Sequence, residues 1–253
     1  MSKKPQPVVM IHGSFCGPWA WHGFAQKFAG SGYKVECPAL RFHDMAQPPE
    51  ALGTTSLSDY VADLEEHLQA LASPAILVGH SLGGLLAQML AARTKLKAAV
   101  LLAPAAPWGV PPSSLLEIAA AQSLLLKVGF WNKVLAPDLD GMERQALSRI
   151  PTAERAALLG RMGPESGRAT FEMVHWGLDM GRASEVEAHK VRCPLLLLAG
   201  GEDRICPPGT VERIAALYRG SHYEKLPGMG HWLIGEPGWE QVADRALRWL
   251  DGL

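Results

Sequence analysis

One short motif in the chain has the residue types and spacing of an activated serine nucleophile. Gly79, Ser81 and Gly83 form a G-x-S-x-G pattern that follows an apolar run of strand length and opens an apolar stretch with helical spacing. In such a setting the glycines permit a tight strand-to-helix turn, which exposes the serine hydroxyl at the end of the strand. The N–H groups at the start of the helix favour negative charge that develops at the same point. The motif therefore predicts acyl transfer through Ser81.

A serine hydroxyl needs a general base, and His231 is the best placed of the nine histidines. It lies in a glycine-containing loop after the last expected strand, and the loops that follow parallel strands gather at one edge of a sheet, where the serine also lies. His12 and His80 lie near strand ends as well. His12 precedes a loop glycine, and His80 lies inside the turn of the serine, so we expect both rings to hydrogen-bond backbone groups.

Asp203 is predicted to orient His231 and to stabilise its cation. It follows the apolar run 195–198, at the same kind of strand end. Its neighbour Glu202 is a rival whose side chain points in a different direction. The strand that ends at Leu102 is another place for the acid, but no carboxylate follows it closely.

The oxyanion of acyl transfer needs two N–H donors, one from the residue after the nucleophile and one from a loop after an early strand. Leu82 supplies the first donor. The second is expected from Ser14, because Gly13 lets this loop approach the serine closely. The N–H of Phe15 is the alternative.

These residues need a framework that brings strand ends together, and the rest of the sequence predicts one. Short apolar runs alternate with amphipathic stretches, which is the pattern of a parallel sheet covered on both faces. The predicted strands cover 8–11, 34–37, 75–78, 98–102, 195–198 and 223–226, and the predicted helices 19–30, 57–71, 82–93, 211–218 and 239–250. Ser56 and Asp59 are expected to cap the second helix, and residues 38–55 are expected to form a long loop.

The alternation of strands and helices stops after residue 103 and resumes near residue 188. The segment between has no strand-like run, and its helical patterns cover 115–128, 140–150 and 152–162. The simplest organisation is an α/β core of residues 1–103 and 188–253 with a helical insertion of residues 104–187.

Composition narrows the class of protein. The 253 residues include 24 Lys+Arg and 25 Asp+Glu, a balance that lacks the basic footprint of a nucleic-acid binder. No apolar run reaches the roughly 18 residues of a membrane helix, and the polar N-terminus does not resemble a signal peptide. Because the four cysteines have no CxxC spacing, we expect reduced thiols in a cytoplasmic protein rather than a zinc or redox site. They are Cys16, Cys37, Cys193 and Cys206.

The chain order Ser81, Asp203, His231 resembles that of the α/β-hydrolase superfamily. The resemblance extends from His12 to the last helix. It implies an α/β-hydrolase fold with a parallel six-stranded sheet flanked by helices, and it makes the insertion 104–187 a cap over the active site.

Within that superfamily, residues 13–21 resemble the corresponding segment of the hydroxynitrile lyase and methylesterase branch. Lyases of this branch have a lysine beside the catalytic histidine. This chain has Trp232 there, which disfavours cyanide chemistry.

Together these observations predict a serine esterase that cleaves a small-to-medium apolar ester or lactone through an acyl-enzyme, without a metal or organic cofactor. Substrate contacts are expected from Phe15, Trp19, His80 and Trp176, although Trp19 could equally pack in the core. The expected partner is a small-molecule substrate, not nucleic acid or a membrane, and the oligomeric state stays open. Two alternatives also stay open: a carbon–carbon bond hydrolase of ring-cleavage diketones, and a slow-turnover ligand receptor on the same scaffold.

Overall fold

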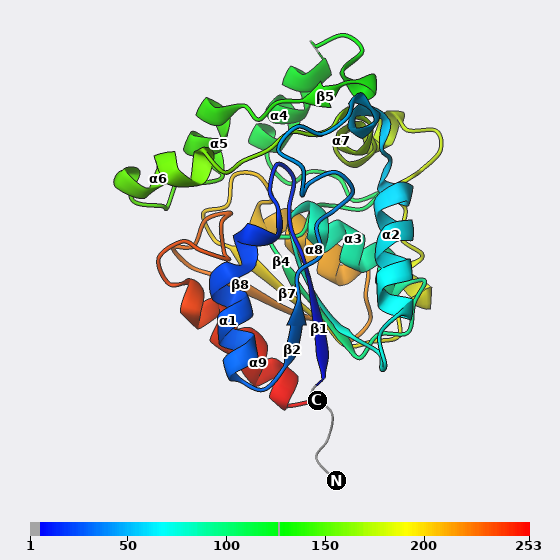
Figure 1. The fold of residues 1–253 in the computed structure, drawn as a ribbon, viewed down its shortest axis with the longest axis vertical. Coiled ribbons are helices and arrows are strands. Elements are labelled where there is room, and N and C mark those ends of the chain that lie inside the picture. Colours follow the sequence, from blue (N-terminus) through cyan, green and yellow to red (C-terminus); the bar gives the residue numbers. More distant parts are fainter. Residues whose placement is uncertain (1–5, 126) are drawn as a thin grey trace.

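A parallel sheet of six strands forms the centre of the molecule in the computed structural model, which describes residues 6–125 and 127–253 (Figure 1). Its order is β2-β1-β3-β4-β7-β8, and every neighbouring pair is parallel, as the sequence predicts. Residues 1–5 and residue 126 lie outside the described residues. The first group belongs to the N-terminal segment in which no targeting signal is expected, and the second to the expected helix 115–128. The strands are β1 (Pro7–Ile11), β2 (Lys34–Glu36), β3 (Ile76–His80), β4 (Ala98–Leu102), β7 (Leu195–Gly200) and β8 (His222–Leu226).

Burial explains why the inner strands have nearly continuous apolar sequences. All residues of β1, β3, β4 and β7 are buried, because helices cover both faces of the sheet. The edge strands are more polar: β2 reads Lys-Val-Glu and β8 reads His-Tyr-Glu-Lys-Leu. These edges are the strands whose apolar pattern is weakest in the sequence.

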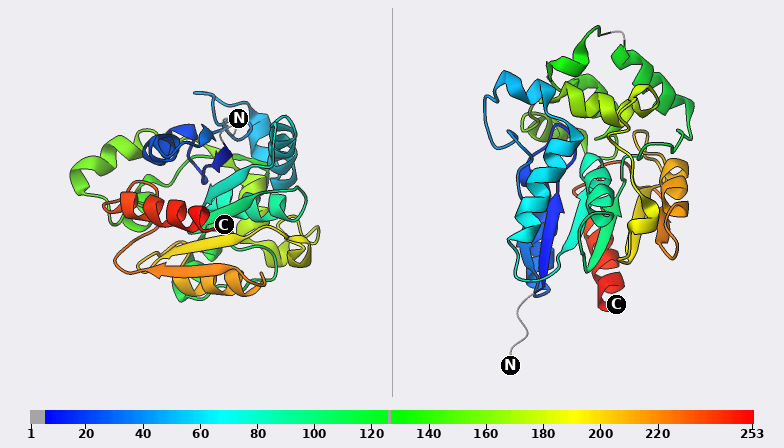
Figure 2. Two further views of the ribbon diagram at one scale, coloured as in Figure 1. Left: turned by 90° about the horizontal axis from the view of Figure 1, so that it is seen from below. Right: turned by 90° about the vertical axis from the view of Figure 1, so that its right-hand side faces the viewer.

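Helices cover both faces of the sheet (Figure 2). One face carries α1 (His22–Gly30) and α9 (Trp239–Asp251), and the other carries α2 (Leu57–Gln69), α3 (Leu82–Ala91) and α8 (Pro208–Ala216). A short 3-10 helix, Pro18–Trp21, precedes α1, where the sequence predicts one continuous helix. Within the described ranges, no helix combines the length and the apolar character needed to cross a membrane.

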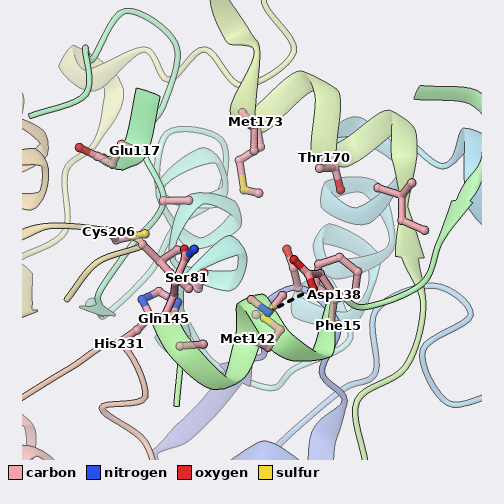
Figure 3. Close-up of a pocket in the computed structure, with 18 of the residues that line it drawn as sticks. Phe15, Ser81, Glu117, Asp138, Met142, Gln145, Thr170, Met173, Cys206 and His231 are labelled. Carbon is pink, nitrogen blue, oxygen red and sulfur yellow. Dashed lines mark hydrogen bonds between the residues drawn. The ribbon is translucent and has the colours of Figure 1, made fainter. Parts of the chain in front are cut away.

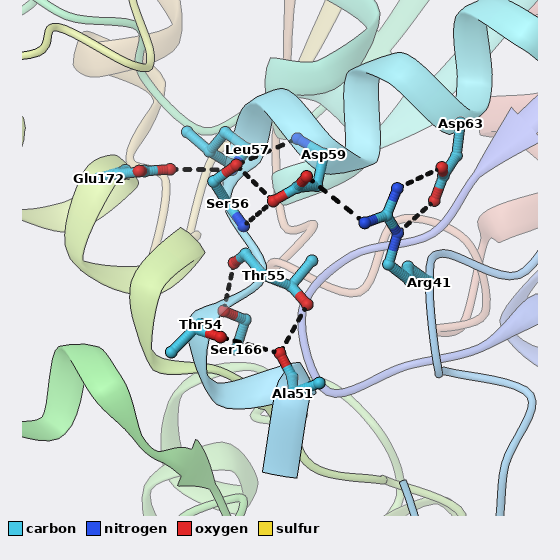
Figure 4. A network of polar contacts seen from close by, with 10 residues as sticks. All are labelled: Arg41, Ala51, Thr54, Thr55, Ser56, Leu57, Asp59, Asp63, Ser166 and Glu172. Atoms are coloured by element: carbon cyan, nitrogen blue, oxygen red, sulfur yellow. Dashed lines mark hydrogen bonds and ion pairs between the residues drawn. The ribbon is translucent and has the colours of Figure 1, made fainter. Parts of the chain in front are cut away.

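The helix α2 begins at the predicted capping box (Figure 4). Ser56 Oγ accepts the N–H of Asp59 at 3.1 Å, and the Asp59 carboxylate accepts the N–H of Ser56 at 2.8 Å. These reciprocal bonds satisfy N–H groups that a helix start otherwise leaves free.

The chain between β4 and β7 lies over the edge of the sheet where the strands end (Figure 1). We call residues 104–187 the cap segment. Contrary to the sequence prediction, it contains two short strands, β5 (Val134–Leu135) and β6 (Glu165–Ser166), which pair antiparallel. Strands of two residues are too short to leave a periodic pattern. The helices of the cap segment are α4 (Leu115–Leu125), α5 (Leu139–Gln145), α6 (Thr152–Leu159) and α7 (Gly167–Val174).

The predicted loop 38–55 also contains local structure that the sequence analysis missed. A 3-10 helix, Glu50–Thr54, packs against β5, β6 and α7 of the cap segment. Residues of this loop, which follows strand β2 of the sheet, thus pack against the cap segment.

Candidate active site

Ser81 lies in a strained turn between β3 and α3. Its φ of 53° and ψ of −117° are disfavoured for a residue with a side chain. The turn needs glycine on both sides, since a Cβ on Gly79 would overlap the carbonyl oxygen of Gly83, and a Cβ on Gly83 would overlap that of Ile11. The Ser81 N–H donates to the Leu102 carbonyl at 3.1 Å, which ties the turn to β4. This is the geometry of a nucleophile elbow.

The predicted base and acid are paired. Nδ1 of His231 lies 2.8 Å from Oδ2 of Asp203, and the two side chains are 5% and 0% exposed. The second oxygen, Oδ1, accepts the N–H groups of Ile205 at 2.7 Å and Cys206 at 2.9 Å. Because Asp203 accepts hydrogen at Nδ1, we assign the Nδ1–H tautomer, which leaves Nε2 of His231 free to accept a proton.

The rival acid is directed elsewhere. The carboxylate of Glu202 forms an exposed ion pair with Arg149 at 3.3 Å. Adjacent residues thus point apart, as expected from the sequence, and Asp203 alone of the two contacts His231.

Two buried side chains hold the backbone around His231. Nε2 of His80 donates to the His231 carbonyl at 2.8 Å, and burial lowers the pKa of His80 to about 3, so this ring is neutral. On the other side, Glu236 Oε1 accepts the N–H of Gly230 at 2.6 Å, and burial raises the pKa of Glu236 to about 7. The expectation that His80 hydrogen-bonds backbone agrees with this geometry. The sequence analysis did not identify Glu236.

The thiol of Cys206 lies beside Ser81, and the sequence analysis also missed it. Burial raises the pKa of this thiol well above its usual range. Cys206 is therefore an uncharged thiol. Cys206 belongs to the turn that begins at Asp203, where its N–H donates to the Asp203 carboxylate. Its place near Ser81 could therefore be predicted only after Asp203 had been chosen as the acid.

The loop after β1 brings one of the two expected oxyanion donors, Ser14, close to Ser81; the other, Leu82, is the first residue of α3. A Cβ on Gly13 would lie 3.1 Å from the Cβ of Ser81, which is tighter than an ordinary van der Waals contact, so glycine eases this approach. Within the described ranges, the N–H groups of Ser14 and Leu82 donate to no other group of the chain. The alternative donor, the N–H of Phe15, is directed to the carboxylate of Glu165 at 3.4 Å.

Ser81 and His231 border one cavity of about 820 Å³ between the sheet and the cap segment (Figure 3). Its wall is mostly apolar, and three methionines of the cap segment contribute to it: Met142, Met162 and Met173.

The four residues expected to contact substrate do not all lie at this cavity. Phe15, His80 and Trp176 line it. Trp19 is not among the lining residues; its indole packs 6.0 Å from that of Trp232, and the guanidinium of Arg161 lies 4.5 Å over the Trp19 ring.

Comparisons with known proteins agree with this fold and place the chain in a family. A model of the alpha/beta hydrolase family matches residues 8–245. Methylesterase 3 and methylesterase 17 of Arabidopsis thaliana are 28% identical over 85 residues and 33% identical over 90 residues. Each match covers 33% of this chain and only 32% or 31% of the relative, so the chain matches about a third of the length of these relatives.

Solved structures match over almost the full length. A monoacylglycerol lipase from Paleococcus ferrophilus has a TM-score of 0.72 and 24% identity, with 98% of this chain and 95% of that chain covered. The methylesterase MES16 from Arabidopsis has a TM-score of 0.75 and 15% identity, with coverage of 98% and 100%. The resemblance noted in the sequence is thereby confirmed, and the chain belongs to the alpha/beta hydrolase family.

Proposed function

We propose that the chain is a serine carboxylic ester hydrolase that cleaves a small-to-medium apolar ester or lactone through an acyl-enzyme. The observation that carries the proposal is the buried 2.8 Å pair of His231 and Asp203 beside the strained Ser81, with serine and histidine at one apolar cavity. A nucleophile, its base and an orienting acid are the groups that acyl transfer requires.

In the proposed reaction, Ser81 Oγ attacks the substrate carbonyl while Nε2 of His231 takes the hydroxyl proton. The N–H groups of Ser14 and Leu82 stabilise the tetrahedral oxyanion. As the intermediate collapses, His231 gives the proton to the leaving alcohol oxygen, and the acyl group stays on Ser81. Asp203 remains a carboxylate and stabilises the imidazolium.

Water completes the cycle. His231 removes a proton from a water molecule, which attacks the acyl-enzyme carbonyl, and the second tetrahedral intermediate collapses to the carboxylic acid and free Ser81. Every proton in both halves moves through His231. The proposed steps use only groups of the chain and water, so the proposal includes no metal or organic cofactor.

The cavity supports the proposed substrate class. Methionine and aromatic side chains in its mostly apolar wall favour apolar acyl or alcohol groups. In this proposal residues 104–187 form the cap that selects the substrate, with contacts from Phe15, His80 and Trp176. Relatives named methylesterase and monoacylglycerol lipase support an ester as the reacting group. A cytoplasmic location is part of the proposal, supported by four free cysteines.

A fluorophosphonate probe tests the proposal directly. Intact-mass analysis is expected to show one adduct on the native protein and none on Ser81→Ala or His231→Ala, because the probe reacts only with an activated serine. Turnover of a panel of p-nitrophenyl and alkyl esters would then establish the reaction. Full ester turnover by Ser81→Ala would contradict the assignment. Turnover of a vinylogous diketone without ester turnover would favour the carbon–carbon hydrolase, and ligand-dependent stabilisation without turnover would favour the receptor.

A further inference from the structure

A buried carboxylate of the cap segment contacts the loop that carries the expected oxyanion donor. Glu165, in β6, is 0% exposed. Its two carboxylate oxygens face four donors from four parts of the chain. These are the Tyr60 hydroxyl at 2.8 Å and the Ser166 N–H at 2.7 Å on Oε1, and the Phe15 N–H at 3.4 Å and Nε2 of His43 at 3.3 Å on Oε2.

His43 is the cation that balances this carboxylate. Its Nδ1 lies 3.0 Å from the Arg41 carbonyl and its Nε2 faces Glu165, so both ring nitrogens face acceptors and both carry hydrogen. Burial alone would lower the pKa of His43, but the Glu165 carboxylate raises it above its ordinary value. Glu165 is therefore a charged, fully bonded group in the interior.

The peptide group before Ser14 N is fixed from the core. The Gly13 carbonyl accepts Nδ1–H of His12 at 2.9 Å and the N–H of Cys16 at 3.3 Å. His12 is neutral, since its Nε2 accepts the N–H of Leu40 at 3.1 Å and burial lowers its pKa to about 4. Because a trans peptide is planar, the N–H of Ser14 points opposite to the anchored Gly13 carbonyl.

The next residue along the loop is fixed from the cap segment. The N–H of Phe15 donates to Glu165, and the Phe15 carbonyl accepts the N–H of Gly163 at 3.0 Å. Phe15 has a φ of 61°, which is disfavoured for a bulky side chain, so contacts from outside the loop must hold it. Residues 163–165 bind both of its backbone polar groups.

We propose that Glu165 is a positioning residue of the oxyanion hole. By holding the Phe15 N–H from the cap segment, it fixes the loop conformation that aims the Ser14 N–H at the oxyanion. This proposal rests on the proposed function, in which Ser14 donates to the tetrahedral intermediate. It makes closure of the cap segment against the loop a condition for a complete oxyanion hole.

A buried carboxylate could also serve only to fasten the cap segment to the core, and Glu172 provides a matched comparison. It is 1% exposed, lies in α7, and accepts the core N–H of Leu57 at 2.8 Å (Figure 4). It also accepts Nε–H of Arg168 at 2.6 Å. Glu172 thus resembles Glu165 in burial and in its bond to the core, but its bonds go to α2 and α7 and not to the loop at Ser14.

The test compares Glu165→Gln with Glu172→Gln on one p-nitrophenyl ester. Glu165→Gln is expected to lower kcat about tenfold or more with little change in KM, because oxyanion donors act mainly in the transition state. It should weaken inhibition by a boronic acid, a mimic of the tetrahedral intermediate, by a similar factor. Glu172→Gln is expected to keep the native kcat even where its melting temperature falls equally.

Glu165→Asp covers the case in which the glutamine variant folds poorly. It keeps the charge that pairs with His43 but withdraws the carboxylate from Phe15 by one methylene, so kcat should again fall at constant KM. Native kcat in the folded aspartate variant, or equal kcat in the two glutamine variants, would overturn the role of Glu165. A native protein without fluorophosphonate labelling or ester turnover would instead overturn the proposed function, and this proposal with it.

Discussion

Asp203 Oδ2 and His231 Nδ1 lie 2.8 Å apart although 27 residues separate them in the chain, and both side chains are almost fully buried. The carboxylate owes its direction to its own turn, because the N–H groups of Ile205 and Cys206 occupy the other oxygen. The pair is therefore preorganised: His231 does not need substrate to adopt its orientation.

Asp203→Asn is expected to lower kcat by about three to four orders of magnitude, since an amide holds the imidazole in the wrong tautomer and leaves its cation unstabilised. The carbonyl oxygen of the asparagine can still accept from the turn, so the melting temperature should change little. Steady-state kinetics and thermal unfolding measure both effects. Glu202→Gln is the matched control, because its neighbouring carboxylate is bonded to Arg149, and it should retain native kcat.

Gly83→Ala is expected to destabilise the fold by about 3 kcal/mol or more, because the new methyl group overlaps the backbone carbonyl of Ile11 and no side chain can yield. Gly30→Ala is the control: a Cβ there meets no atom within 4 Å, and alanine in a helix should be neutral or stabilising by up to about 1 kcal/mol. Urea unfolding of the two variants gives the comparison. Equal stabilities would contradict the crowding seen at the elbow.

Glu236 predicts a pH dependence of stability. Burial raises the pKa of Glu236 from 4.5 to about 7, so between these values the folded protein keeps a proton that the unfolded chain has released. The contribution of Glu236 to the free energy of unfolding therefore falls as pH rises through this window, and the full loss of stability is reached above about pH 7. Glu236→Gln cannot titrate, yet its amide oxygen can still accept the Gly230 N–H.

The measurement is the melting temperature of native protein and Glu236→Gln at several pH values between 5 and 8. The variant should gain on the native protein as pH rises. Parallel curves would show that the carboxyl group titrates near its ordinary value.

Met173→Trp is expected to lower kcat/KM for long acyl chains about tenfold while turnover of an acetate ester stays close to native, because the larger ring fills the part of the cavity that the cap segment forms. Met180→Trp serves as the control, since Met180 is 94% exposed. A series of p-nitrophenyl esters of increasing chain length provides the data. An equal loss for all chain lengths in Met173→Trp would argue against this wall as the acyl site.

The framework of this site was predictable because each part leaves a local signal. The strands β3 and β7 are largely apolar runs. The turn at Ser81 has glycines two residues before and two residues after the serine. The loops that carry Asp203 and His231 follow strands that end at the same edge of the sheet. Topology then brings them together without any long-range information. The pairing of His231 with Asp203 agrees with that reasoning.

The contacts of Glu165 could not be predicted in this way. Its bond to Phe15 joins residues 150 positions apart, and its strand, β6, is two residues long. A single buried glutamate leaves no periodic pattern in the sequence that would predict its burial. His43, which balances its charge, lies in the segment 38–55 that the sequence predicts as a loop. The same holds for Trp19, whose packing against Trp232 depends on how two loops meet.

The bonds from residues 163–165 to Phe15 bear on how members of this family can be recombined. A chimera that transfers residues 104–187 to another scaffold as a self-contained module would separate Glu165 from its partners Phe15, His43 and Tyr60. In the recipient, the Glu165 carboxylate would face whatever residues that scaffold has at the positions of Phe15, His43 and Tyr60. Successful grafts are expected to transfer positions 12–15, 40–43 and 60 together with the module, so that the recombination boundary follows the hydrogen-bond network and not the strand ends.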